Sequence, residues 1–219
     1  MKAIRERAEA LAAAAKESRA AAAAKAAGGP PRGAPAQVRI IGGQWKRSML
    51  PVAHKPGLRP TPDRVRETLF NWLGNELDGW RVVDAYAGSG ALGFEAASRG
   101  AAAVLLLEQD AGLVRSLGES KTRLKAEAIR VQRTDALSWL KSAPMASFEL
   151  VLIDPPFDSE LALPSLEAAA KLVVPGGFVY LETGAELKEA PAGLQLHRHM
   201  KAGTVHAHLL RAATPEQPA

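Results

Sequence analysis

Short apolar runs recur along the chain, separated by stretches in which apolar residues follow helical spacing. The runs 103–108, 148–153 and 178–182 are mostly apolar, as is typical of strands buried on both faces of a parallel sheet. Between the last two, residues 160–174 predict a helix that ends at the breaker Pro175-Gly176-Gly177. Strands that alternate with helices predict an α/β fold built on a parallel sheet.

The two ends of this region have a different pattern. Residues 194–199 and 205–211 alternate apolar and polar side chains around a short turn, which predicts an antiparallel hairpin that closes the sheet. Residues 38–52 predict a second pair of strands around the turn Gly42-Gly43.

A helix is predicted to start shortly before the first parallel strand. Thr61 is placed to cap this helix, and Pro62 suits its first position because the proline ring presets φ. Apolar residues at helical spacing between 65 and 77 should pack on the sheet. Arg64 and Arg66 are then expected to face outward.

A glycine-rich turn follows the strand predicted at 81–84. Gly88, Gly90 and Gly93 match the G-x-G-x-x-G pattern of dinucleotide sites, in which the turn presses a helix N-terminus against a pyrophosphate. Here Asp84 ends the strand before the turn. Its carboxylate would repel a pyrophosphate, but it would attract a cofactor that carries an ammonium and a sulfonium, as S-adenosylmethionine does.

Further acids end the strands that follow. Glu108 ends the run 103–108, where an acid accepts hydrogen bonds from the hydroxyls of a ribose. Asp135 ends the short strand predicted from Ile129 and could accept from an adenine amino group. Because the carboxyl ends of parallel strands meet at one edge of a sheet, the acids should lie near one another.

The strand at 148–153 runs directly into Asp154-Pro155-Pro156-Phe157. Two successive prolines fix the backbone and remove two N–H donors, so the carbonyls of this turn only accept. An exocyclic amino group fits such a turn, since the Asp154 carboxylate and the Pro155 carbonyl can accept its two N–H bonds while Phe157 stacks on the base.

Together these motifs resemble the class I S-adenosylmethionine-dependent methyltransferases of the amino-N-methylating kind. The segments 39–46 and 57–73 narrow the resemblance to the bacterial 16S ribosomal RNA guanine-N2-methyltransferases. It runs from about Val38 to Arg211. The Ala-rich N-terminal tail and Tyr86, where Phe is more usual, depart from the family pattern.

The resemblance implies a doubly wound, seven-stranded Rossmann-like sheet that is mostly parallel, with an antiparallel C-terminal hairpin and a small N-terminal extension. It implies methyl transfer from S-adenosylmethionine to the exocyclic N2 of a guanine in 16S ribosomal RNA, either free or in a small-subunit assembly particle. The catalytic turn would be Asp154, Pro155, Pro156 and Phe157, and the cofactor would lie against Asp84, Ala87, Gly88, Ser89, Gly90, Glu108, Asp135 and Ala136.

Other functions remain open on the sequence. Asp-Pro-Pro-aromatic turns also occur in enzymes that methylate adenine N6 in DNA or a glutamine amide in protein. A nicotinamide oxidoreductase would need the glycine-rich turn to hold a pyrophosphate. A non-catalytic RNA-binding protein would bind RNA without methyl transfer.

Charge is distributed unevenly along the chain. Residues 1–36 carry a net charge of +4, residues 37–80 carry +3 and residues 81–219 carry −2. We therefore expect an Ala-rich flexible tail (1–36) before a methyltransferase domain (37–219), in which 37–80 grip RNA and 81–219 form the cofactor-binding and catalytic core. The expected RNA contacts are Arg39, Trp45, Lys46, Arg47, Arg59, Thr61, Arg64 and Arg66.

Composition excludes several other classes. The chain has no Cys, so it has neither disulfides nor a thiolate metal site, which suits a cytoplasmic protein. Its longest apolar runs are far below the ~18 residues of a membrane span. Histidines at 197 and 199, and at 206 and 208, have same-face spacing on the predicted hairpin. A hydrated sheet face explains this spacing, and we expect no metal.

Overall fold

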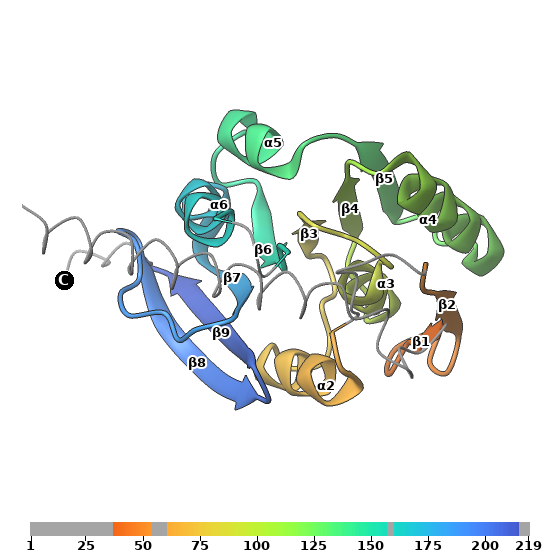
Figure 1. The fold of residues 1–219 in the computed structure, drawn as a ribbon, viewed down its shortest axis with the longest axis horizontal. Helices are drawn as coiled ribbons and strands as arrows, with labels where there is room; N and C mark the ends of the chain where they lie inside the picture. Colours follow the sequence, from red (N-terminus) through yellow and green to blue (C-terminus); the bar gives the residue numbers. More distant parts are fainter. Residues whose placement is uncertain (1–36, 54–60, 157–159, 215–219) are drawn as a thin grey trace, which may run out of the picture. The chain divides into compact units, whose positions relative to one another are not determined.

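The computed structural model describes residues 37–53, 61–156 and 160–214, all of which belong to one compact unit of the chain. Its main feature is a seven-stranded sheet in the order β5-β4-β3-β6-β7-β9-β8 (Figure 1). The strands are β3 (Arg81–Asp84), β4 (Ala103–Glu108), β5 (Ile129–Arg133), β6 (Phe148–Ile153), β7 (Val173–Thr183), β8 (Leu194–Ala202) and β9 (Val205–Ala212).

The sheet is parallel from β5 to β7 and antiparallel where β9 joins β7 and β8. The order of the strands reverses between β3 and β6, the two strands that lie at its centre. In doubly wound sheets ligands bind outside the carboxyl ends of the strands at such a reversal. The predicted fold class is confirmed, including the antiparallel hairpin at the C-terminus.

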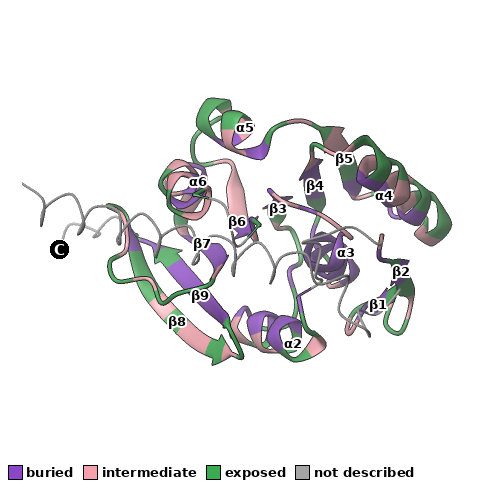
Figure 2. Cartoon of the chain, viewed as in Figure 1, coloured by how far each residue is buried: buried purple, intermediate pink, exposed green. Residues whose placement is uncertain are grey.

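Helices cover both faces of the sheet, and two apolar clusters mark the two interfaces. One cluster joins the sheet to α2 (Asp63–Trp72), α3 (Ala91–Ser98) and α4 (Ala111–Leu124), and the other joins it to α5 (Ala136–Ser142) and α6 (Ala162–Ala169). Helix α3 is buried along its whole length, as Figure 2 shows. Burial on both faces explains why the central strands read as continuous apolar runs.

A small two-stranded sheet, β1 (Gln37–Arg39) and β2 (Met49–Pro51), precedes α2. The loop between its strands packs on α3, and glycine is needed there. A Cβ at Gly43, which has φ of 71°, would overlap the backbone carbonyl of Ser98, and a Cβ at Gly42 would overlap the Arg99 guanidinium. The predicted strands around Gly42-Gly43 are therefore present, and the glycine pair allows the close approach.

Candidate active site

Acidic side chains collect at the carboxyl edge of the sheet. Asp84 and Glu108 end β3 and β4, Asp154 follows β6 directly, and Glu182 lies next to the end of β7. These four strands are consecutive neighbours in the sheet, in the order β4-β3-β6-β7. The edge therefore gathers four carboxyl groups at the point where the strand order reverses.

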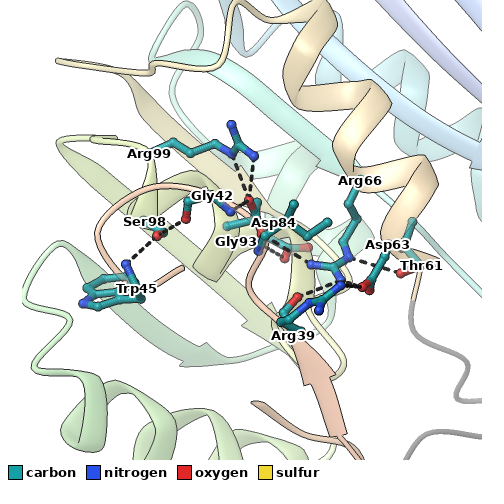
Figure 3. Close-up of polar contacts among 12 residues, drawn as sticks. Arg39, Gly42, Trp45, Thr61, Asp63, Arg66, Asp84, Gly93, Ser98 and Arg99 are labelled. Atoms are coloured by element: carbon teal, nitrogen blue, oxygen red, sulfur yellow. Dashed lines mark hydrogen bonds and ion pairs between the residues drawn. The ribbon is translucent and has the colours of Figure 1, made fainter. Parts of the chain in front are cut away.

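Asp84 is buried and bonded to the helix that follows it. Its Oδ2 accepts a hydrogen bond from the Gly93 N–H at 2.9 Å, so it satisfies one of the unpaired donors in the first turn of α3 (Figure 3). Burial raises the pKa of Asp84 to about 7, and the charge of Glu108 contributes in the same direction. A Cβ at Gly93 would overlap the end of the Leu106 side chain and crowd the Asp84 carboxylate, so a larger residue here would force these side chains to move.

The glycine-rich turn is held by the second acid. Glu108 Oε2 accepts from the Gly88 N–H at 3.1 Å, and its Oε1 accepts from the Asp110 N–H at 2.8 Å. Gly88 and Gly90 have φ of 52° and 79°, a region that residues with a Cβ rarely adopt. Ala87 is buried, and Ser89 lies in the turn between the two glycines. The turn is thus fixed against β4 by a carboxylate.

Asp135 lies two residues beyond the end of β5, later than the sequence suggested. It caps α5, since its Oδ1 accepts from the Ser138 N–H at 2.8 Å, and hydrogen bonds from Ser138 lower its pKa. Ala136, the first residue of α5, is buried. A carboxylate has about four acceptor sites, so the cap leaves capacity for another donor.

Asp154 is bonded to Thr61, a residue that we expected to cap α2. The Thr61 hydroxyl donates to Asp154 Oδ2 at 3.2 Å, and Thr61 is 5% exposed. The prediction that Thr61 caps α2 is wrong, because its hydroxyl bonds Asp154 instead, and the helix starts at Asp63 after Pro62 without a side-chain cap. The buried Thr61 side chain therefore belongs to the acidic edge.

The rest of the proline turn is described in part. Pro155 is buried and Pro156 is exposed, while Phe157 lies outside the described residues. Burial and the charge of Glu182 raise the pKa of Asp154 well above its ordinary value, and the Thr61 hydroxyl opposes this shift.

Sequence reasoning missed Glu182. It is 2% exposed, and its Oε1 accepts a hydrogen bond from the buried Tyr180 hydroxyl at 2.8 Å. The signal was present, since Glu182 ends the apolar run 178–182 in the same way that Glu108 ends its own run.

Most of the expected RNA contacts within the described residues are exposed. Lys46 and Arg47 are exposed on the loop between β1 and β2, and Arg64 is exposed on α2. Arg39 is exposed and forms an ion pair with Asp63 at 3.0 Å. Arg59 lies outside the described residues. These cations lie on the segment for which sequence analysis predicted an RNA surface.

Trp45 lies on the same loop and is partly buried. Its ring meets Phe94 edge-on with centroids 6.5 Å apart, and its backbone N–H donates to the Ser98 hydroxyl at 2.9 Å (Figure 3). Of the two roles considered for Trp45, base stacking and packing, the structure shows the packing contact.

Arg66 does not face outward, and that prediction is wrong. Its side chain is 0% exposed, and its guanidinium pairs with Asp63 at 2.6 Å and with Glu95 at 3.4 Å (Figure 3). It also donates to the carbonyls of Arg39 and Thr61. A guanidinium bonded on all sides by the protein has no surface to offer a phosphate, so Arg66 is a structural residue.

Three histidines of the C-terminal hairpin lie together: His199, His206 and His208 have possible ligand atoms within 4.8 Å of one another. His199 Nε2 and His206 Nδ1 are 3.1 Å apart. His208 accepts from the Leu187 N–H at its Nε2 at 3.0 Å, and its Nδ1 lies 3.4 Å from the Leu181 carbonyl oxygen. The rings are stacked with interplanar angles of 13–18°. Our expectation that no metal binds stays a prediction.

In the part of the chain that the structure describes, no helix is both long and apolar enough to cross a bilayer.

Comparison with known proteins identifies the family. Residues 38–211 match the model of the family described as conserved hypothetical protein 95. The chain is 44% identical over 179 residues to ribosomal RNA small subunit methyltransferase D of Escherichia coli strain K12, covering 77% of this chain and 87% of the relative. It is 40% identical over 157 residues to the Haemophilus influenzae enzyme of the same name, covering 68% and 80%.

A solved structure agrees with these relatives. The putative methyltransferase yhhF from Escherichia coli matches with a TM-score of 0.73 and 37% identity, covering 81% of this chain and 98% of that one. The chain therefore belongs to the conserved hypothetical protein 95 family, together with the ribosomal RNA small subunit methyltransferases D.

Proposed function

We propose that this protein transfers a methyl group from S-adenosylmethionine to the exocyclic N2 of a guanine in 16S ribosomal RNA. Family membership makes it a small-subunit ribosomal RNA methyltransferase, and the guanine and its N2 come from the resemblance stated above. The observation that carries the proposal is that the match over residues 38–211 contains the whole acidic edge, from Asp84 to Glu182.

The residues of the edge fit S-adenosylmethionine better than a dinucleotide. Two backbone donors that a pyrophosphate would need already have acceptors, since Gly88 N–H bonds Glu108 and Gly93 N–H bonds Asp84. A pyrophosphate would meet two carboxylates, whereas a cation is attracted to them. Glu108 uses one acceptor site on each oxygen for a backbone donor, which leaves capacity for two ribose hydroxyls. Asp135 would accept from the adenine amino group.

S-adenosylmethionine, when bound, supplies a methyl group activated by a positively charged sulfur. The chain's own contribution concerns the amino group that receives it. The Asp154 carboxylate and the Pro155 carbonyl would accept the two N–H bonds of that group and turn its lone pair toward the donor. These hydrogen bonds strengthen as positive charge develops on the nitrogen, so they favour the transition state over the ground state.

Asp154 is also suited to receive the proton that the nitrogen must lose. The raised pKa of Asp154 makes it a stronger base than an exposed aspartate. Thr61 donates a hydrogen bond to Oδ2 of this carboxylate, and the bond fixes the orientation of the Asp154 side chain. Phe157 would stack on the target base.

The RNA would approach along the basic residues of the N-terminal part. Lys46, Arg47 and Arg64 carry exposed cations, and Arg39 is 56% exposed beside Asp63. We accordingly propose that residues 37–80 form the RNA-binding extension of a domain whose catalytic core is 81–219, with Arg59 a further phosphate contact. We no longer expect Thr61 and Arg66 to contact RNA, because their side chains are buried.

The decisive experiment supplies purified protein with labelled S-adenosylmethionine and with small ribosomal subunits or free 16S RNA from cells that lack the protein. Nucleoside mass analysis should find N2-methylguanosine in the product. Labelled N6-methyladenosine, methyl transfer to protein, or RNA binding without transfer would each replace the proposal with one of the alternatives. Calorimetry with S-adenosylmethionine and with NAD separates the two cofactors independently of the substrate.

A further inference from the structure

Two carboxyl groups lie beside each other at the catalytic edge, and one of them has no role in the function proposed above. Strands β6 and β7 are parallel neighbours, and their register pairs Ile153 with Leu181. Asp154 follows Ile153 just beyond the end of β6, and Glu182 follows Leu181 within β7. The register therefore brings the two residues to neighbouring positions at the acidic edge.

Hydroxyl groups connect the two acids. Thr61 donates to Asp154 Oδ2 at 3.2 Å, and the same hydroxyl interacts with the Glu182 carboxyl and lowers its pKa. Tyr180 donates to Glu182 Oε1 at 2.8 Å. Each acid therefore has its own hydroxyl partner, Thr61 for Asp154 and Tyr180 for Glu182.

Asp154 is partly buried and Glu182 is 2% exposed, and two neighbouring carboxyl groups in such a site do not both ionise at low cost. Burial raises the pKa of both, and the charge of Glu182 raises that of Asp154 further. The other ionisable groups that face the pair are Asp84 from β3, which adds to the repulsion, and Arg66 from α2, whose charge favours ionised Glu182. Tyr180 favours ionised Glu182 as well.

We propose that Asp154 and Glu182 hold one proton between them, and that Glu182 acts as a positioning residue that sets the pH at which Asp154 can receive the substrate's proton. The inference rests on the proposed function only for the role of Asp154 as acceptor. Tyr180 and Arg66 stabilise the charged form of Glu182, so the shared proton resides mainly on Asp154 in the free protein.

The proton balance of the reaction is then simple. Asp154 releases its proton to water before the amino group of the substrate reacts. After methylation, one N–H bond of the cationic nitrogen breaks, its electron pair stays on nitrogen, and the proton forms an O–H bond with Asp154. Glu182 keeps its charge throughout, and the proton taken from the nitrogen leaves Asp154 in the protonated state from which the next turnover starts.

Opposite shifts in two variants test this arrangement. Glu182→Gln removes the neighbouring negative charge, so the pKa of Asp154 falls and the acid limb of the kcat/KM profile moves to lower pH by at least about one unit. Thr61→Val removes the hydroxyl that stabilises the Asp154 carboxylate, so the acid limb moves to higher pH. Glu186→Gln, which neutralises an exposed acid on the neighbouring loop, is the control and should leave the profile unchanged.

The same proton can be followed in the free protein without any turnover. Isotope-edited infrared spectroscopy of aspartate-labelled protein reports the protonated carboxyl, and Asp154→Asn identifies its band. The band should persist to higher pH in the unaltered protein than in Glu182→Gln. If Glu182→Gln does not fold, Tyr180→Phe serves instead: it weakens the charged form of Glu182, moves the proton toward Glu182 and reduces the Asp154 band.

The outcomes distinguish the shared proton from the proposed function. An Asp154 band that titrates identically in the unaltered protein and in the folded variants would overturn proton sharing. Shifts of the kinetic limb in the same direction for Glu182→Gln and Thr61→Val would also overturn it, because a general loss of structure moves both alike. Absence of methyl transfer with the expected infrared shifts would instead refute the proposed function and leave the shared proton standing.

Discussion

The inward-facing acids of this protein fall into two groups that differ in their hydrogen-bond donors. Asp84, Glu95 and Glu108 accept from backbone N–H groups, whereas Asp154 and Glu182 accept from the hydroxyls of Thr61 and Tyr180. A buried backbone N–H that loses its acceptor remains unpaired at a cost of about 1–3 kcal/mol, but a hydroxyl can rotate to another partner. We therefore propose that the donor, more than the depth of burial, separates acids that mainly hold the fold from acids that take part in proton transfer.

Glu95 gives the strongest test of the first group. Its carboxylate accepts from the N–H groups of Ile41 and Gly42 at 2.7 Å and pairs with Arg66 and Arg99. Glu95→Gln should lower the free energy of unfolding by about 3–5 kcal/mol, because it leaves a buried guanidinium short of its counter-charge. Denaturant titration measures the change. Glu67→Gln on the exposed face of α2 is the matched control, and a loss as small as that of the control would remove Glu95 from the group.

Asp154 gives the corresponding test of the second group. Asp154→Asn should lower kcat about 10²–10³-fold, or about 2.7–4 kcal/mol, as expected for one preorganised polar contact. The free energy of unfolding should stay the same or rise, since the variant relieves repulsion with Glu182. Single-turnover kinetics and thermal unfolding provide both values, with Glu160→Gln as an exposed control. Near-normal turnover in a folded Asp154→Asn protein would refute the catalytic role.

Glu108 tests whether one acid can belong to both groups. It holds Gly88 and Asp110 through their N–H groups and is also the expected partner of the ribose hydroxyls. Glu108→Gln should weaken S-adenosylmethionine binding by about 1–3 kcal/mol, because hydrogen bonds to a charged acceptor are the stronger kind. Calorimetry on the folded variant decides. Unchanged affinity would place Glu108 with the structural acids alone.

The same division applies to the arginines and predicts the smallest effect. Exposed Arg47 is available to a phosphate, whereas Arg66 is bonded within the protein. Neutralising Lys46 or Arg47 should reduce the slope of log affinity against log salt by roughly 0.7–0.9 for each phosphate that the variant no longer neutralises. RNA binding at several salt concentrations measures the slope. Arg198→Gln, on the distant hairpin strand β8, should leave it unchanged, and equal slopes for all variants would exclude the loop from the RNA surface.

Local patterns were enough to predict the sheet and most of the acidic edge. Apolar runs mark strands that are buried on both faces, and an acid at the end of such a run lies at the carboxyl edge whichever strands are neighbours. Asp84, Glu108 and Asp154 were found in this way. Which acids face each other depends on strand order and register, and no local pattern carries that information. Glu182 also ends an apolar run, so the local pattern could have found it, but its place beside Asp154 could not be predicted in this way.

Thr61 and Arg66 show where local rules fail. Thr61 precedes a helix, as a capping residue does, but its partner Asp154 is 93 residues away in sequence. Arg66 lies next to the apolar positions of α2. Helical spacing alone predicts that a charged side chain at this position faces solvent. It is buried because Glu95 of α3 and the Arg39 carbonyl of β1 meet it there. Both errors come from contacts between segments far apart in the chain.

The packing of β1 and β2 on α3 has a consequence for how the protein opens. Val38, Ile40 and Leu50 are at most 4% exposed and belong to the same apolar cluster as Phe94 of α3. Glu95 and Ser98 of that helix hold the N–H groups of Ile41, Gly42 and Trp45. Backbone amides of this segment should therefore exchange with solvent only when α3 itself unfolds, with the protection of the central strands rather than of a surface hairpin. Residues 37–80 thus have a proposed role of their own in RNA binding, but their strands β1 and β2 are expected to unfold only together with α3.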